Sequence, residues 1–156
     1  MSKTLLPVMA AATAIAAPGL AEARQVTIEA QLKNYSGDGA YLAVYVTDAA
    51  GKYKGTLWMA GRKSRFWSHL TDWAKQAGRS ANVDGITGAS VGSGKTLKIS
   101  VDIADALIDA GYQVRVDSSV EDARDYGSDA VAPLATASSG KPAPGKGYVQ
   151  TLKVTF

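Results

Sequence analysis

The chain has 156 residues, a formal net charge of +3, no cysteine and one histidine. Its length suits one domain with a substantial core. The lack of cysteine excludes disulfides, thiolate metal sites and Cys-x-x-Cys-His haem attachment, and the lone His69 excludes a multi-histidine metal site within one chain. A charge so close to balance also argues against a nucleic-acid partner.

The first 23 residues have the features of a secretory signal peptide. Lys3 precedes an apolar stretch from Leu5 to Ala17, and Ala21-Glu22-Ala23 provides a small-x-small cleavage site. The apolar stretch is too short for a membrane-spanning helix. A retained N-terminal anchor is the alternative. We therefore expect an exported, periplasmic protein whose single domain covers residues 24–156.

The rest of the chain is dominated by short segments with strand character. In 25–32, for example, Val26, Ile28, Ala30 and Leu32 alternate with polar residues, as in a half-buried strand. Such spacing, with turn residues between the segments, predicts an all-β antiparallel sandwich. The predicted strands are 25–32, 40–48, 53–59, 96–102, 112–116 and 148–156; 103–110 is a helical turn or acidic loop, and the proline-containing 128–147 is a loop.

One amphipathic helix is predicted, over about residues 64–78. Ser64 is a plausible N-cap and Gly78 fits the position after the last turn. Between them, apolar residues recur at three- and four-residue spacing: Phe66, Trp67, Leu70, Trp73, Ala74 and Ala77. Such a stripe usually packs on a neighbouring sheet. A helix lying on a membrane surface is the alternative.

The segment Asp84-Gly85-Ile86-Thr87-Gly88-Ala89-Ser90 resembles the acceptor motif at which bacteria attach FMN covalently to exported proteins. In that motif an Asp stands six positions before a Thr or Ser, and a Gly-Ala pair precedes the hydroxyl residue. The resemblance implies an FMN phosphoester on Ser90, formed by the FAD:protein FMN transferase. Its recognition segment would be Asp84, Gly85, Thr87, Gly88 and Ala89.

The residue types agree with that reading. A serine hydroxyl is a weak nucleophile unless a base or metal activates it. No His, Lys or carboxylate lies within two residues of Ser90, so activation would come from another protein. Small residues let the backbone enter a foreign active site. A plain glycine-rich loop between strands is the alternative. Trp67, Trp73 or Trp58 are candidates for stacking on the flavin ring.

Residues 89–96 also fit a relaxed phosphate-loop pattern ending in Gly94-Lys95-Thr96. A phosphate loop needs a buried strand before it and a helix after it. Here a strand-like alternation follows instead, so we do not expect ATP binding. We expect a mobile, solvent-open loop that a transferase can reach.

Charge is distributed unevenly along the chain. Residues 51–79 hold seven basic residues and one acidic residue, whereas residues 101–129 hold eight acidic and two basic ones. The basic segment could favour a phosphate or a reduced, anionic flavin. Two solvated faces of opposite sign are the alternative.

The whole mature chain resembles a family of small exported bacterial domains, described as predicted periplasmic proteins of unknown function. The landmarks that carry this resemblance are 41–52, Trp67 to Trp73, Asp84 to Ser90, Ala110-Gly111-Tyr112 and 120–127. It implies an immunoglobulin-like sandwich that works beside PepSY-type membrane proteins and the FMN transferase. The chain departs from the family in having Ser90, where Thr is commoner, and in lacking a Trp and a Gly-rich turn within 96–110.

Together these features predict a periplasmic flavin carrier that transfers electrons and is not itself an enzyme. The alternative is a cofactor-free exported binding module in a PepSY-linked membrane assembly. Resemblance to the FMN-binding domains of sodium-pumping oxidoreductases covers only the motif. No nucleophile–base pair supports a hydrolase, and no metal site is expected.

Overall fold

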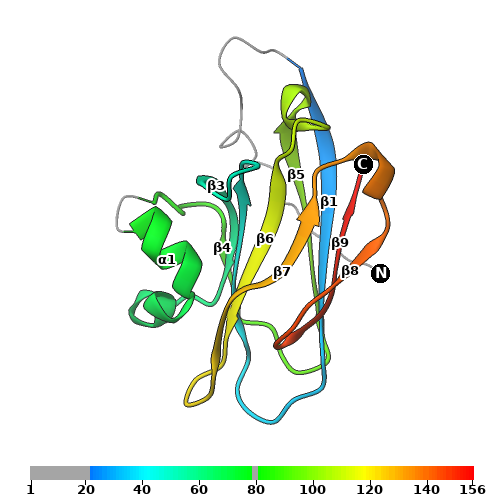
Figure 1. The fold of residues 1–156 in the computed structure, drawn as a ribbon. Helices are drawn as coiled ribbons and strands as arrows, with labels where there is room; N and C mark the ends of the chain where they lie inside the picture. The colour runs from blue at the N-terminus through cyan, green and yellow to red at the C-terminus, as the bar shows by residue number, and fades with distance from the viewer. Residues whose placement is uncertain (1–21, 79–80) are drawn as a thin grey trace.

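Two β-sheets packed face to face organise the chain, seen in a computed structural model that describes residues 22–78 and 81–156 (Figure 1). The four-stranded sheet has the order β5-β1-β9-β8, with β1 Ala23–Leu32, β5 Thr96–Ala104, β8 Pro142–Pro144 and β9 Val149–Thr155. The five-stranded sheet has the order β4-β3-β2-β6-β7, with β2 Tyr41–Thr47, β3 Tyr53–Ala60, β4 Thr87–Gly88, β6 Gln113–Ser119 and β7 Asp125–Pro133. Strand pairs are antiparallel except β3–β4, which is parallel. The predicted antiparallel β-sandwich is confirmed.

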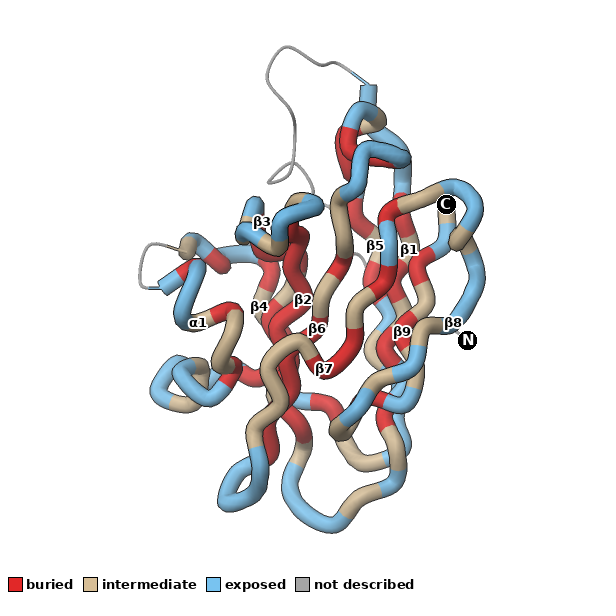
Figure 2. Tube along the Cα trace, in the orientation of Figure 1, coloured by how far each residue is buried: buried red, intermediate tan, exposed pale blue. Residues whose placement is uncertain are grey.

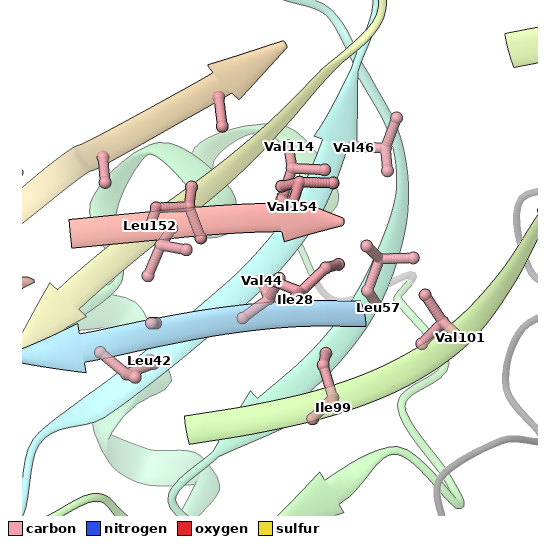
Figure 3. Close-up of a cluster of buried hydrophobic side chains, with 14 of the residues drawn as sticks. Ile28, Leu42, Val44, Val46, Leu57, Ile99, Val101, Val114, Leu152 and Val154 are labelled. Carbon is pink, nitrogen blue, oxygen red and sulfur yellow. The ribbon is translucent and has the colours of Figure 1, made fainter. Parts of the chain in front are cut away.

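The main core lies between the sheets and follows the strand alternation. In β1, Val26, Ile28, Ala30 and Leu32 are buried, as the sequence pattern predicts. Figure 2 shows the buried positions concentrated on the facing sheets. Figure 3 shows side chains from both sheets meeting in this core: Ile28, Ile99, Val101, Leu152 and Val154 from the four-stranded sheet, and Leu42, Val44, Val46, Leu57 and Val114 from the five-stranded one.

The helical segment covers the outer face of the five-stranded sheet (Figure 1). It consists of a 3-10 segment, η2 Ser64–His69, followed by α1 Thr71–Ala77, so the predicted single helix over 64–78 is split. Lys63, not Ser64, is the residue at the N-terminal cap of η2, and no side chain caps it. Gly78 ends α1 with a φ of 58°, a conformation that favours glycine.

A second core lies beneath α1. Ala43 and Tyr45 of β2 point toward the helix, whereas Val44 and Val46 point between the sheets. β2 is therefore buried on both faces. The second core contains Ala43, Tyr45, Met59, Leu70, Trp73, Ala77, Val83 and Ile86. The apolar stripe of the helical segment is thus core packing, and a membrane-surface role for that face is wrong.

The predicted loop over 128–147 is wrong in its first part. Residues 128–133 belong to β7, and the short strand β8 follows after a 3-10 turn, η5 Thr136–Ser138. β7 was missed because its inward residues Ala130 and Ala132 are small and give little apolar signal. β8 was missed because it contains two prolines, which a strand tolerates at the edge of a sheet. Within 103–110, the first two residues extend β5 and a 3-10 turn, η4 Asp105–Leu107, follows.

Asp117 of β6 connects the helix to the sheet although its side chain is fully buried. Its Oδ2 accepts a hydrogen bond of 2.7 Å from the Trp73 N–H in α1. Its Oδ1 accepts bonds of 2.7 Å from both the Tyr45 hydroxyl and the Ser128 N–H. Burial raises the pKa of Asp117 above its ordinary range, although these three donors oppose the shift. A buried carboxylate therefore ties α1, β2 and β7 together.

The predicted signal peptide, residues 1–23, lies outside the described residues except for Glu22 and Ala23. Ala23 is the first residue of β1 and pairs with Ala104. Among the described helices, none has the length and apolar character needed to cross a membrane.

Candidate functional site

The Asp84–Ser90 segment runs along the edge of the five-stranded sheet. Thr87 and Gly88 form β4, which pairs with β3 through a hydrogen bond of 2.8 Å from the Gly61 N–H to the Gly88 carbonyl. Just beyond Ser90, Val91 exchanges backbone hydrogen bonds of 2.6 and 2.9 Å with Ala40. Ser90 therefore lies between two backbone positions that are hydrogen-bonded to neighbouring segments, and it is exposed, as the expected solvent-open loop requires.

Val91, the residue after the acceptor-like segment, is also held by a side chain. The Tyr35 hydroxyl donates to the carbonyls of Asp38 and Val91 at 2.8 and 3.2 Å. The Ser93 hydroxyl accepts a bond of 2.7 Å from the Tyr35 N–H. Thr96 then enters β5, so the phosphate-loop-like residues lead into a strand, as their alternation predicts.

The two glycines of the segment have structural reasons to be glycine. Gly85 has a φ of 81°, in the left-handed region. At Gly88, a side-chain Cβ would lie 2.6 Å from Cζ2 of Trp58. Trp58 thus packs directly against the backbone of β4, and the glycine pattern alone does not distinguish an acceptor motif from a tight structural turn.

Gly88→Ala should lower the free energy of unfolding by about 1–3 kcal/mol, because the added methyl overlaps the Trp58 ring. Gly92→Ala is the matched control, since its Cβ would lie 3.5 Å from the nearest atom, an ordinary contact. Urea unfolding followed by tryptophan fluorescence measures both. Equal stabilities for the two variants would contradict the packing of Trp58 on Gly88.

Ser90 is exposed, as are Asp84, Gly85 and Ala89. Among the described residues, the Ser90 hydroxyl has no hydrogen-bond partner, whereas the Thr87 hydroxyl donates to the Val83 carbonyl at 2.8 Å. The Ser90 side chain rests on Gly39, where a Cβ would come within 2.5 Å of the Ser90 Oγ. The segment therefore presents one free and accessible hydroxyl, at Ser90.

Ser90 lines a pocket of about 460 Å³. Pockets that hold small molecules and cofactors commonly measure about 300–1,000 Å³. Four separate stretches of the chain meet here, and they contribute Asp38, Gly39, Tyr41, Lys63, Phe66, His69, Ser90, Ser119, Val120, Glu121, Asp122 and Ala123. The pocket lies beside the turn between β6 and β7, at the end of η2.

His69 and Asp125 form an ion-pair-like contact at this pocket. Nδ1 of His69 lies 2.9 Å from Oδ2 of Asp125, and the Ser119 hydroxyl donates to Oδ1 of the same carboxylate at 2.8 Å. The His69 side chain is 53% exposed and that of Asp125 is 28% exposed. The lone histidine is thus oriented by a carboxylate, and it lines the same pocket as the Ser90 hydroxyl, which is free within the described structure.

The predicted stacking tryptophans do not line the pocket. Trp73 is buried in the second core and donates its indole N–H to the Thr56 hydroxyl at 2.9 Å. The Trp67 indole N–H donates to the Gly61 carbonyl at 3.0 Å. The Trp67 and Trp73 rings pack edge to face, with their centroids 6.1 Å apart. Trp58 packs on Gly88. The aromatic residues that do line the pocket are Tyr41 and Phe66.

The basic and acidic segments meet across this pocket. Lys63 and His69 come from the first, and Glu121 and Asp122 from the second. These four residues are exposed to solvent, and the two segments lie around one pocket here and not on separate faces. Asp38 adds a further carboxylate, so the pocket offers charges of both signs. Within the described residues, no group of three or more His, Asp or Glu side chains is placed to hold a metal ion.

Sequence reasoning missed Tyr41, Phe66, His69 and Asp125 as site residues. His69 and Asp125 are 56 positions apart, and nothing in the local sequence of either indicates the other. The one usable signal was that His69 is the only histidine, placed within the predicted amphipathic helix.

A family model described as "Predicted periplasmic protein (DUF2271)" matches residues 23–151 of the chain. The match includes both sheets up to the third residue of β9, the helical segment and every residue of the pocket. No curated protein and no solved structure matches the chain.

Proposed function

The chain belongs to the DUF2271 family of predicted periplasmic proteins, and we propose that it serves in the periplasm as a flavin carrier, with FMN bound covalently through a phosphoester to Ser90. In this proposal the protein is the substrate of a transferase and a redox subunit, not an enzyme by itself. Its redox partner would be a membrane protein, of the PepSY type that the sequence resemblance implies.

One observation carries the proposal: the Ser90 hydroxyl is exposed, free of hydrogen bonds within the described structure, and situated at a cofactor-sized pocket. The neighbouring hydroxyls differ. That of Thr87 bonds the Val83 carbonyl, and that of Ser93 bonds the Tyr35 N–H. A modifying enzyme would therefore find a single unengaged nucleophile on this segment.

The attachment step balances as a phosphoryl-group transfer from FAD. The Ser90 oxygen forms a bond to the phosphorus on the FMN side of the pyrophosphate. The bond from that phosphorus to the bridging oxygen breaks, and AMP leaves. A base of the transferase takes the hydroxyl proton, because a serine needs such activation. The backbone hydrogen bonds at Gly88 and Val91 restrict the movement of the backbone that carries the acceptor oxygen.

The residues that line the pocket suit an FMN group. Tyr41 and Phe66 offer aromatic contact for a flavin ring, and Lys63 offers a cation for its phosphate. The flavin, when bound, supplies the redox chemistry, and the protein supplies position and electrostatics.

The proposal is tested by intact mass spectrometry of the protein produced in a periplasm with and without an active FAD:protein FMN transferase. We expect the mass to rise by one FMN phosphoester only when the transferase is active. Trypsin cuts after Arg79 and Lys95, so the modification should appear on the peptide 80–95, and fragmentation should place it on Ser90. An unchanged mass in the presence of a transferase that modifies a known acceptor would refute the carrier function.

A second candidate function is a cofactor-free binding module in a PepSY-linked assembly. The observation that favours it is that Gly85 and Gly88 are both required by the fold itself. This candidate predicts a colourless protein with no flavin fluorescence even after production with the transferase.

A further inference from the structure

The pocket beside Ser90 has an aromatic wall that is already fixed in place. The Tyr41 ring lies against the backbone of Gly61, where any Cβ would overlap it. Its hydroxyl accepts a hydrogen bond of 3.1 Å from the Lys63 N–H, and its ring meets Phe66 edge to face at 5.6 Å. Gly61 also has a φ of 112°, which favours glycine. The wall is therefore preorganised to receive a flat apolar group.

Another part of the same pocket is polar, and hydrogen bonds fix the orientation of its histidine. A carboxylate can only accept, so Nδ1 of His69 carries the hydrogen that binds Asp125. The Ser119 hydroxyl holds the other oxygen of that carboxylate. Nε2 is then the ring nitrogen left for a ligand: it accepts when the imidazole is neutral and donates when it is protonated.

An isoalloxazine ring is apolar at one end and polar at the other, as the two parts of the pocket are. Its dimethylbenzene end is apolar, and its pyrimidine end carries carbonyl oxygens and an N–H. We propose that the pocket is the binding site of the isoalloxazine carried on Ser90, with Tyr41 and Phe66 as its aromatic contacts and His69 as its polar partner. This inference rests on the proposed function, because Ser90 would tether the ring to the pocket that it lines.

The inference predicts that the attached flavin is shielded from solvent. Pockets bury about 70–90% of a small ligand's surface, so collisional quenching by neutral acrylamide should be about three- to tenfold weaker than for free FMN. The measurement uses the flavinylated full-length protein, with the loading of each sample established by intact mass. Phe66→Leu should return the quenching constant most of the way to that of free FMN, and His69→Leu should move it in the same direction by less.

Phe156→Leu is the matched control. The chain has two phenylalanines; both are half-buried, and both have an arginine over the ring, Arg65 over Phe66 at 4.8 Å and Arg24 over Phe156 at 5.7 Å. Phe156 does not line the pocket. Its replacement should leave the quenching constant at the wild-type value.

The outcomes separate this inference from the carrier function. A flavin attached at Ser90 but quenched as readily as free FMN would overturn the pocket assignment and leave the carrier function standing. Equal constants for the Phe66 and Phe156 variants would also overturn it. If no flavin is attached, the carrier function fails, and titration of riboflavin into the unmodified protein decides the pocket by itself: saturable binding that Phe66→Leu weakens supports the assignment, and absence of binding overturns it.

Discussion

Ser90→Ala is expected to abolish the FMN mass gain completely, and Ser93→Ala to leave it at the wild-type level. Ser93 lies three residues after Ser90, but of the two hydroxyls only that of Ser90 is unengaged within the described structure, because Ser93 accepts a hydrogen bond of 2.7 Å from the Tyr35 N–H. The readout is intact mass after production with the transferase, so the effect is all or none. Ser90→Thr should retain the modification, since it keeps an acceptor hydroxyl at the same place.

Two results would contradict this expectation. Modification that persists in Ser90→Ala would place the acceptor elsewhere, with Thr87 as the nearest other hydroxyl in the motif. Loss of modification in both serine variants would show that the segment must be intact for recognition, and would leave the acceptor oxygen unassigned. Far-ultraviolet circular dichroism establishes that each variant keeps its β-sheet fold before the mass is compared.

The sequence predicted the strands whose core residues are large. β1, β5 and β9 alternate Val, Ile and Leu with polar residues, and the structure buries these side chains except Leu97, which is partly buried. β7 escaped notice because its buried positions are Asp129, Ala130 and Ala132. Asp129 is kept in the core by accepting hydrogen bonds from Lys146, Gly147 and Val149 N–H groups at 2.7–3.0 Å. These donors lie 17 to 20 residues further along the chain, in the loop before β9 and at its first residue. The periodicity of the β7 sequence alone therefore does not reveal them.

The candidate site also has a part that the sequence predicted and a part that it did not. Ser90 and its neighbours form a contiguous motif, so they could be singled out from the sequence. The pocket could not, because Tyr41, Phe66, His69 and Ser119 come together only through the pairing of β2 with β6 and the placement of η2. Nearness in sequence suggested Trp67 and Trp73 as ring partners. The fold instead uses both in the core beneath α1.

Asp117→Asn should lower the free energy of unfolding at neutral pH by about 1–3 kcal/mol, because one buried donor loses its acceptor. An asparagine oxygen can keep the Tyr45 and Ser128 bonds at the Oδ1 position. Its amide nitrogen would then face the Trp73 N–H, which Oδ2 now accepts at 2.7 Å. The bond that docks α1 on the sheet is the one lost. Chemical denaturation measures the change, and Asp102→Asn, on an exposed position of β5, is the control with little expected effect.

The pH dependence of this difference has a definite sign. Burial raises the pKa of Asp117 above its ordinary value of 3.8, so the folded protein binds this proton more tightly than the unfolded chain does. The stability contributed by the titrating Asp117 is therefore greatest below pH 3.8 and declines as the pH rises through its folded pKa. The amide that replaces this carboxyl in Asp117→Asn does not titrate, so the stability gap between wild type and variant should narrow as the pH rises through that window and then stay constant. A gap that widens with pH would show that the three hydrogen bonds to the carboxylate outweigh its burial, and that the ionised form is the one the fold prefers.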